Sequence, residues 1–201
     1  MALTARGKSI FWLVAVVVLV ADLSTKWWVV SARLGVDPSD LVPDQSCAAG
    51  EPILGESFKL VALLNPGMMW GTFKDFPLAL KLFRLVALLV VLYLYLEIAA
   101  REWLGLSALG AILGGAIGNI YDSFTYGGVR DFLHFDLGFF PFDPWPAFNV
   151  ADASICVGVA TLALVLLRRP HSQPNPGEPN TEVANGNSSG RGVLGDLPRT
   201  S

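Results

Sequence analysis

"GGAIGNIYDSFTYGGVRDFLHF", residues 114–135, decides the fold, because one run of chain passes from an apolar helix to a cluster of polar residues. Gly114 and Gly118 have the small-xxx-small spacing that lets two membrane helices approach closely. Asn119 and Asp122 follow near the helix end and share one helix face through their i,i+3 spacing. Two further glycines then turn the chain toward Asp131. The stretch therefore predicts a packed helix that delivers polar groups to one end of a bundle.

The composition of the whole chain indicates a membrane protein. Of its 201 residues, 53% are hydrophobic and only 15% are charged, and such values are unusual for a soluble domain. A membrane span needs about 20 apolar residues. Four stretches approach this length, at about 9–30, 78–98, 103–122 and 148–167. The net charge of −3 gives no electrostatic footprint for nucleic-acid binding, which would need a clustered basic face.

The topology follows from the basic residues that flank these spans. Lysines and arginines before the first span, between the second and third, and after the fourth predict that both termini are cytoplasmic. Outer loops then cover about 31–77 and 123–147, and a β-prone run before an Asn-Pro-Gly turn predicts a strand in the first. Lys81 and Arg84 fit this topology poorly, at the outer end of the second span, where snorkelling or an interfacial first turn would accommodate them. We thus predict an all-α membrane protein with four transmembrane helices and a small β-containing periplasmic cap over residues 1–169, and a disordered cytoplasmic tail over 170–201.

Several polar residues lie within or beside the predicted spans, and all lie at one depth. A charge at the centre of a span costs about 2.5–3.5 kcal/mol on insertion scales, so such residues need a reason to be there. They form three pairs with helical spacing: Asp22 with Lys26, Asn119 with Asp122, and Asn149 with Asp152. Each pair shares a helix face. The pairs can therefore converge on one pocket toward the outer leaflet.

Taken singly, these polar residues have structural explanations, but together they indicate chemistry. Asp22 and Lys26 can form an ion pair at a helix end, and the asparagines can donate hydrogen bonds across helices. A zinc site is poorly supported because the chain lacks H-E-x-x-H, and a serine nucleophile has no base on its own helix face. Two carboxylates, Asp131 and Asp152, remain. Like-charge repulsion in such a pair raises one pKa, which allows metal-free and cofactor-free peptide hydrolysis.

Four blocks of sequence, in order and spacing, resemble those of bacterial lipoprotein signal peptidase, also called signal peptidase II. The blocks are "DLSTKWW" (22–28), "NPGMMWG" (65–71), residues 114–135 and "PAFNVADASICVG" (146–158). The resemblance covers about 9–167. It implies a multi-pass aspartic endopeptidase of the bacterial inner membrane, with its active site near the periplasmic face. Such an enzyme removes the signal peptide from lipid-modified prolipoproteins, cutting before the diacylglyceryl-cysteine. Its partners would be these substrates and membrane lipids, and we expect a monomer.

The resemblance also assigns roles to residues. It places the catalytic aspartates at Asp131 and Asp152. The supporting or substrate-binding positions are Asp22, Lys26, Asn65, Gly67, Asn119, Asp122 and Asn149.

The chain departs from the family pattern at three places. Leu23 stands where Gln is usual, and Met69-Trp70-Gly71 stands where Ala-Phe-Gly is favoured. Ser123 stands where the family usually has Arg after the aspartate of the third helix. We hypothesise that Arg130 takes the place of that arginine as a partner of Asp122 or of the substrate.

Two other classes of function compete with a peptidase. A small proton-coupled transporter could use the aspartates as a proton relay, but it would favour carboxylates near the midplane and interrupted, repeated helices. The sequence has neither. A non-catalytic membrane scaffold would leave the cluster of buried polar residues unexplained.

Overall fold

The computed structural model describes residues 2–43, 50–55, 57–67, 75–99, 102–136, 138 and 145–168. Residues 1–169 form one compact unit. The predicted disordered tail, 170–201, and the departure at residues 69–71 lie outside the described residues.

Four helices of the described part are long and apolar enough to cross a membrane. They are α1 (Ala2–Trp27), α2 (Pro77–Glu97), α3 (Trp103–Thr125) and α4 (Val150–Leu167). A long apolar helix is thus present at each of the four predicted spans, with small differences at the ends. α1 continues as a π-helical segment, η1 (Trp28–Arg33), in which the Leu34 N–H donates to the Val29 carbonyl over 2.9 Å.

α3 is the central helix, and its glycines are the reason. A Cβ on Gly114 would collide with the Ala15 carbonyl of α1, whereas a Cβ on Gly115 would lie 2.6 Å from the Ala151 carbonyl of α4. Neighbouring residues on a helix point in different directions, so the two glycines admit two different helices. The close approach predicted from Gly114 and Gly118 is thus present, and α2 packs mainly against α3.

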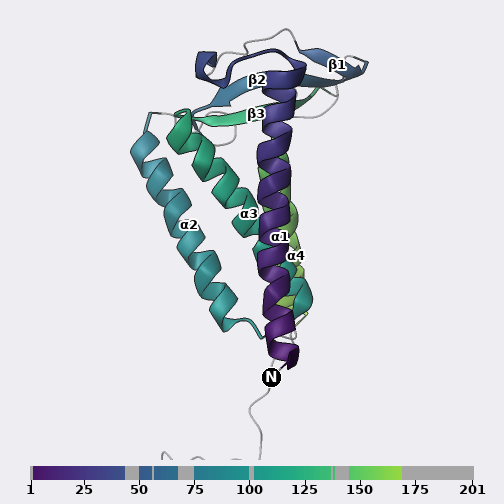
Figure 1. The fold of residues 1–201 in the computed structure, drawn as a ribbon, viewed down its shortest axis with the longest axis vertical. Helices are drawn as coiled ribbons and strands as arrows, with labels where there is room; N and C mark the ends of the chain where they lie inside the picture. Colours follow the sequence, from purple (N-terminus) through teal and green to yellow (C-terminus); the bar gives the residue numbers. More distant parts are fainter. Residues whose placement is uncertain are drawn as a thin grey trace, which may run out of the picture. The chain divides into compact units, whose positions relative to one another are not determined.

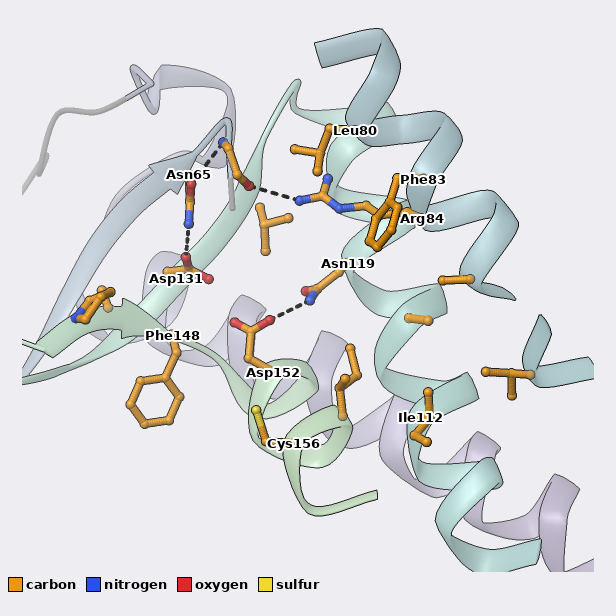
Figure 2. Close-up of a pocket in the computed structure, with 18 of the residues that line it drawn as sticks. Asn65, Leu80, Phe83, Arg84, Ile112, Asn119, Asp131, Phe148, Asp152 and Cys156 are labelled. Atoms are coloured by element: carbon orange, nitrogen blue, oxygen red, sulfur yellow. Dashed lines mark hydrogen bonds between the residues drawn. The ribbon is translucent and has the colours of Figure 1, made fainter. Parts of the chain in front are cut away.

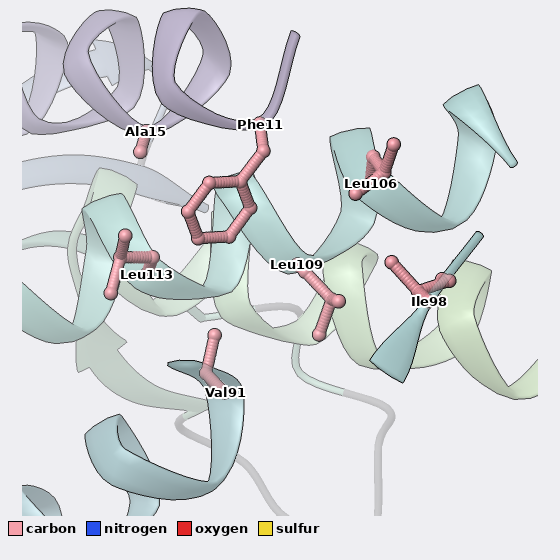
Figure 3. Close-up of a cluster of buried hydrophobic side chains, with 7 residues drawn as sticks. All are labelled: Phe11, Ala15, Val91, Ile98, Leu106, Leu109 and Leu113. Carbon is pink, nitrogen blue, oxygen red and sulfur yellow. The ribbon is translucent and has the colours of Figure 1, made fainter. Parts of the chain in front are cut away.

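An apolar cluster joins three of these helices away from the polar pairs (Figure 3). Its buried side chains come from α1, α2, α3 and the residue after α2, and they are Phe11, Ala15, Val91, Ile98, Leu106, Leu109 and Leu113. The Phe11 ring also stacks on Tyr95, with 4.2 Å between ring centroids. Apolar packing of this kind holds the helices together without hydrogen bonds.

A four-stranded antiparallel sheet lies at the end of the bundle opposite the N-terminus (Figure 1). Its strands, in spatial order, are β1 (Glu51–Leu54), β2 (Phe58–Asn65), β3 (Val129–Phe135) and β4 (Trp145–Phe148). The strand predicted in the first outer loop is confirmed as β2. The second outer loop, in which no strand was predicted, supplies β3 and β4, because residues 129–135 pair with β2. The small β-containing part that was predicted is therefore built from both outer loops.

The sheet is held over the helices by apolar side chains from β2, β3 and η1. Val30 of η1 packs with Ala62 and Leu64 of β2, and Val29 packs with Leu60 and Phe132. These contacts place the start of β3 directly beside the ends of α1, α3 and α4. We call this the sheet end of the bundle.

Candidate active site

Asp131 lies on β3 with its carboxylate buried and held by two amides. The pairing of β2 with β3 sets Leu63 opposite Asp131, which brings the end of β2 close to the carboxylate. Asn65 Nδ2 donates to Asp131 Oδ2 over 3.0 Å, and Asn149 Nδ2 donates to Oδ1 over 2.7 Å. Only 2% of Asp131 is exposed. Both of its oxygens therefore have a protein donor.

Asp152 lies in the first turn of α4, where the end of the helix fixes its position. Asn149 is the N-cap: its Oδ1 accepts from the Asp152 N–H over 2.9 Å, and Asp152 Oδ2 accepts from the Asn149 N–H over 3.2 Å. This reciprocal pair is a capping box. Asn119 Nδ2 of α3 donates to Asp152 Oδ1 over 2.8 Å. The second carboxylate is thus held as firmly as the first.

The three asparagine amides all present their NH₂ groups to the carboxylates, because donors elsewhere occupy their oxygens. Asn65 Oδ1 accepts from the Gly67 N–H over 3.0 Å. Asn119 Oδ1 accepts from Lys26 Nζ over 3.0 Å, and Asn149 Oδ1 accepts from the first turn of α4. An amide has one accepting and one donating end. Each outer partner therefore decides which way its amide points.

Behind the amides lies a buried cluster of compensating charges. Lys26 Nζ is 2.8 Å from Asp22 Oδ2 and 3.2 Å from Asp122 Oδ2, and these three side chains are fully buried. Arg130 Nη2 is 2.7 Å from Asp122 Oδ1. Asp22 Oδ1 also accepts from the Ala151 N–H over 2.9 Å. Two cations thus balance two carboxylates, as buried charges require. The cluster joins α1, α3, β3 and α4.

Burial and then the neighbouring Asp152 carboxylate raise the pKa of Asp131 to about 8. The hydrogen bonds from Asn65 and Asn149, and the charge of Lys26, act in the opposite direction. Burial dominates because it penalises the charged form of a carboxyl group. Burial therefore favours the protonated, neutral form of Asp131.

Both carboxylates face a cavity of about 380 Å³ (Figure 2). Its polar end contains Asp131, Asp152 and the residues that surround them, Asn65, Gly67, Arg84 and Asn119. Its apolar end runs between α2, α3 and α4 and is lined by side chains such as Val91, Ile112 and Ile155. The Trp145–Phe148 strand, β4, forms a further wall. The cavity thus extends from the two aspartates at its polar end to an apolar region between the helices.

All ten residues singled out from the sequence are brought together at the sheet end. Asp131, Asp152, Asn65, Gly67 and Asn119 line the cavity. Asn149 bonds both carboxylates, and the remaining four form the charge cluster behind them: Asp22, Lys26, Asp122 and Arg130. The contact between Arg130 and Asp122 that we hypothesised is present, and Arg130 is not among the cavity-lining residues.

One cavity residue, Arg84 of α2, was not chosen as a site residue from the sequence. Its Nη2 donates to the Gly67 carbonyl over 3.2 Å, and its Nη1 donates to Ser123 Oγ. Lys81, by contrast, lies over the Phe124 ring with Nζ 4.9 Å from the centroid. The feature of the sequence that could have identified Arg84 was the poor fit of two basic residues, Lys81 and Arg84, to the outer end of an apolar span. Both side chains also have specific partners near the start of α2.

The described part of the chain contains no group of three or more His, Cys, Asp or Glu residues placed to hold a metal ion.

With this geometry established, comparison with known proteins decides the family. A family profile described as Signal peptidase (SPase) II matches residues 14–168. The chain belongs to the signal peptidase II family. It is 35% identical over 185 residues to the lipoprotein signal peptidase of Nitratidesulfovibrio vulgaris, an alignment that covers 90% of this chain and 99% of the relative.

Other members of the signal peptidase II family align over shorter stretches. The lipoprotein signal peptidase of Aquifex aeolicus is 40% identical over 106 residues, and this match covers 51% of the chain and 61% of the relative. The lipoprotein signal peptidase of Syntrophotalea carbinolica is 37% identical over 120 residues, covering 58% and 73%. Family membership supports signal peptidase II function. The proton-coupled transporter considered above finds no support in these comparisons.

The fold is shared with solved bacterial membrane enzymes. One, determined by the in meso method at 2.3 Å resolution, superposes with a TM-score of 0.63 at 22% identity, covering 77% of this chain and 85% of the other. A second, at 1.9 Å resolution, gives a TM-score of 0.57 at 22% identity. The four apolar helices and the small antiparallel sheet thus form the fold of these solved enzymes, and they are consistent with a multi-pass membrane protein.

Proposed function

We propose that this chain is an aspartic endopeptidase that removes signal peptides from lipid-modified prolipoproteins, cutting before the diacylglyceryl-cysteine. The observation that carries the proposal is the pair of carboxylates, Asp131 and Asp152, that face one cavity with each of their oxygens hydrogen-bonded. Family membership supplies the substrate class.

The two carboxyl groups differ in a way that divides their roles. Asp131 is the more deeply buried and favours its protonated form, so it acts as the acid. Asp152 lies at the N-terminal end of α4, where the helix dipole favours negative charge, and it accepts hydrogen bonds from Asn119 and from the Asn149 main chain. It acts as the base.

Hydrolysis then proceeds by proton transfers between these two groups and the scissile peptide. Asp152 takes a proton from the attacking water as the water oxygen bonds to the carbonyl carbon. Asp131 gives its proton to the carbonyl oxygen, which produces a neutral tetrahedral diol. When the C–N bond breaks, the proton on Asp152 passes to the leaving nitrogen and a diol proton returns to Asp131. The pair ends in its starting state.

The amides keep this pair in one geometry during the reaction. Lys26 orients Asn119 toward Asp152, and the N-cap position orients Asn149 toward Asp131. Groups held in this way need little reorganisation as charge moves. The buried charge cluster therefore acts as a positioning layer for the dyad.

The cavity suits a substrate that arrives within the membrane. Its apolar end, between α2, α3 and α4, would receive apolar substrate segments, while the scissile bond lies at the carboxylates. We place the protein in the bacterial inner membrane as a monomer, surrounded by membrane lipids as well as substrate. Both termini are cytoplasmic and the sheet end faces the periplasm, in accord with the flanking charges.

The decisive experiment is cleavage by Asp131→Asn and Asp152→Asn variants of a lipidated precursor. Each change removes a proton-transfer group, so kcat should fall by roughly 10²–10⁴-fold. Asp136→Asn is the matched control, because this exposed aspartate directly follows β3. Ordinary turnover by either dyad variant would disprove the proposal.

Two further arms test the substrate class and the chemistry. A precursor that lacks the diacylglyceryl group should be cut poorly or not at all. Addition of a chelator should leave cleavage of the lipidated precursor unchanged. Equal cleavage of both precursors would refute the lipid requirement, and inhibition by the chelator would refute the metal-free mechanism.

A further inference from the structure

Arg84 extends from α2 toward the cavity, although much of this helix is exposed. The buried side chains described in α2 are Leu80 and Val91. Arg84 follows Leu80 by four residues and so shares its face. Figure 2 shows its guanidinium extending from α2 toward the polar end of the cavity. Such a position is costly for a cation in a membrane helix and requires a use.

The charges of Asp152 and Asp131 attract Arg84 across the cavity, but neither aspartate forms an ion pair with it. Its two hydrogen bonds go to neutral oxygens, the Gly67 carbonyl and Ser123 Oγ. Among the described residues, no carboxylate lies within ion-pair distance of it. A guanidinium has five N–H donors in a fixed fork, so these two bonds leave donors for a further acceptor. The hydrogen bonds to the Gly67 carbonyl and Ser123 Oγ hold the guanidinium in place beside the cavity.

The cavity determines which acceptor fits. The dyad already places negative charge near Asp131 and Asp152, and a carboxylate or phosphate on the ligand would add repulsion there. A neutral carbonyl oxygen avoids this cost and still accepts from a charged donor. A prolipoprotein offers such oxygens in its peptide backbone and in the esters of its diacylglyceryl group.

We propose that Arg84 is a substrate-binding residue that donates hydrogen bonds to carbonyl oxygens of the bound prolipoprotein. The inference rests on the proposed function, and it adds α2 to the elements that hold the substrate. The Gly67 carbonyl and Ser123 orient the guanidinium, so that α2 and the polar end of the cavity are joined through one side chain.

The kinetic test compares Arg84→Gln, Arg84→Lys and Lys81→Gln on a lipidated precursor. Loss of a charged donor should raise KM by roughly 10–100-fold, while kcat should change much less, because Arg84 forms no hydrogen bond or ion pair with either aspartate of the dyad. Lysine keeps the charge but not the fork and should recover part of the loss. Lys81→Gln is the matched control, since Lys81 contacts Phe124 outside the cavity, and its KM should be unchanged.

A second readout measures binding without turnover. Cys156 is exposed and lines the cavity, and Cys47→Ser leaves it as the single cysteine of the chain. In an Asp152→Asn background, bound precursor should protect Cys156 from alkylation. Arg84→Gln should raise the precursor concentration for half-protection by roughly tenfold or more, as expected for a lost charged hydrogen bond.

Comparison of the lipidated and non-lipidated precursors shows which carbonyl group accepts the hydrogen bond from Arg84. A weaker protection by both lipidated and non-lipidated precursor would assign it to the peptide backbone. A weaker protection by the lipidated precursor alone would assign it to the ester groups. Either result supports the inference.

Three results would overturn it. The first is that Arg84→Gln leaves both KM and the precursor concentration for half-protection unchanged. The second is a loss of kcat with a shifted pH profile at constant KM. The third is a loss of thermal stability at constant KM. The second would make Arg84 an electrostatic partner of the dyad, and the third a structural residue. Failure of the unaltered protein to cleave would reject the proposed function itself, which is a separate outcome.

Discussion

The two ends of the helix bundle are held together by different forces. Near the N-terminus of α1, the buried core is apolar and includes Phe11 and Leu109, with a hydrogen bond at its edge from Lys8 Nζ to the Tyr95 carbonyl over 2.6 Å. At the sheet end, the same helices meet through Asp22, Lys26 and Asp122, which are fully buried. α3 takes part in both regions.

The difference lies in how specific each set of contacts is. Apolar packing is non-directional, and a core of suitable volume tolerates substitutions of similar shape. Hydrogen bonds and ion pairs are directional, and a buried polar group that loses its partner carries its full desolvation cost. The apolar end therefore contributes stability, whereas the sheet end also determines where the carboxylates point.

The largest loss of stability should follow Lys26→Met. This change leaves Asp22 buried without its cation, and removal of one partner from a buried pair costs about 3–5 kcal/mol. It also removes one of the two donors to Asn119 Oδ1, leaving only Asn149 Nδ2 at 3.2 Å, so cleavage should fall as well. Unfolding in detergent micelles and turnover of a lipidated precursor measure the two effects.

The double variant Lys26→Met/Asp22→Asn is the control for this prediction. Because it removes both charges, it should recover part of the stability, while Asn119 still lacks its lysine donor. If the single variant were as stable as the unaltered protein, the buried cluster would not be the stabilising element that we describe.

Leu109→Ala tests the apolar end and should affect stability alone. Leu109 is fully buried, and truncation of such a leucine costs about 2–5 kcal/mol through lost contacts and the cavity left behind. At a temperature where the variant stays folded, its kcat should match that of the unaltered protein. A clear loss of kcat would contradict the separation of the two ends.

Gly118→Ala and Gly114→Ala compare the two ends along one helix face. A Cβ on Gly118 would collide with the Asp22 carboxylate, and one on Gly114 with the Ala15 carbonyl. Overpacking of this kind typically costs about 1–3 kcal/mol. Both variants should lose stability, but only Gly118→Ala should also lose kcat, because it displaces Asp22 from Lys26. Similar kcat values would show that the charge cluster does not position the dyad.

The smallest effect concerns pH. With the pKa of Asp131 raised from 3.8 to about 8, cleavage should decline as pH rises through about 8, because the acid is lost. The folded state binds this proton more tightly than the unfolded state, so the free energy of unfolding should also fall as pH rises between these values.

Asn65→Ala sharpens this prediction. The Asn65 hydrogen bond lowers the pKa of Asp131, so its removal should move the alkaline limb of the pH–rate profile to higher pH. Asp136→Asn should leave the limb in place. A shift to lower pH in Asn65→Ala would mean that a group other than Asp131 controls the limb.

Much of this arrangement could be predicted because its signals are local. The four spans follow from hydrophobic length, and the helical spacing of Asn119 with Asp122 places their side chains on one face. β3 was missed because residues 129–135 alternate little between polar and apolar, since the strand is buried on both sides at its start. The catalytic roles of Asp131 and Asp152 stay predictions until the variants are measured.

The sequence by itself determined the membrane spans, the crowding of polar residues at one depth and the choice of two aspartates. These depend on properties read over a few residues, namely hydrophobic length, helical period and the cost of burying a charge. Only the tertiary structure decided which way each amide points, how Arg130 pairs with Asp122 and that Arg84 enters the cavity. Those outcomes depend on partners far apart in the chain, such as Lys26 and Asn119, because a hydrogen bond acts over a distance and direction that folding alone sets.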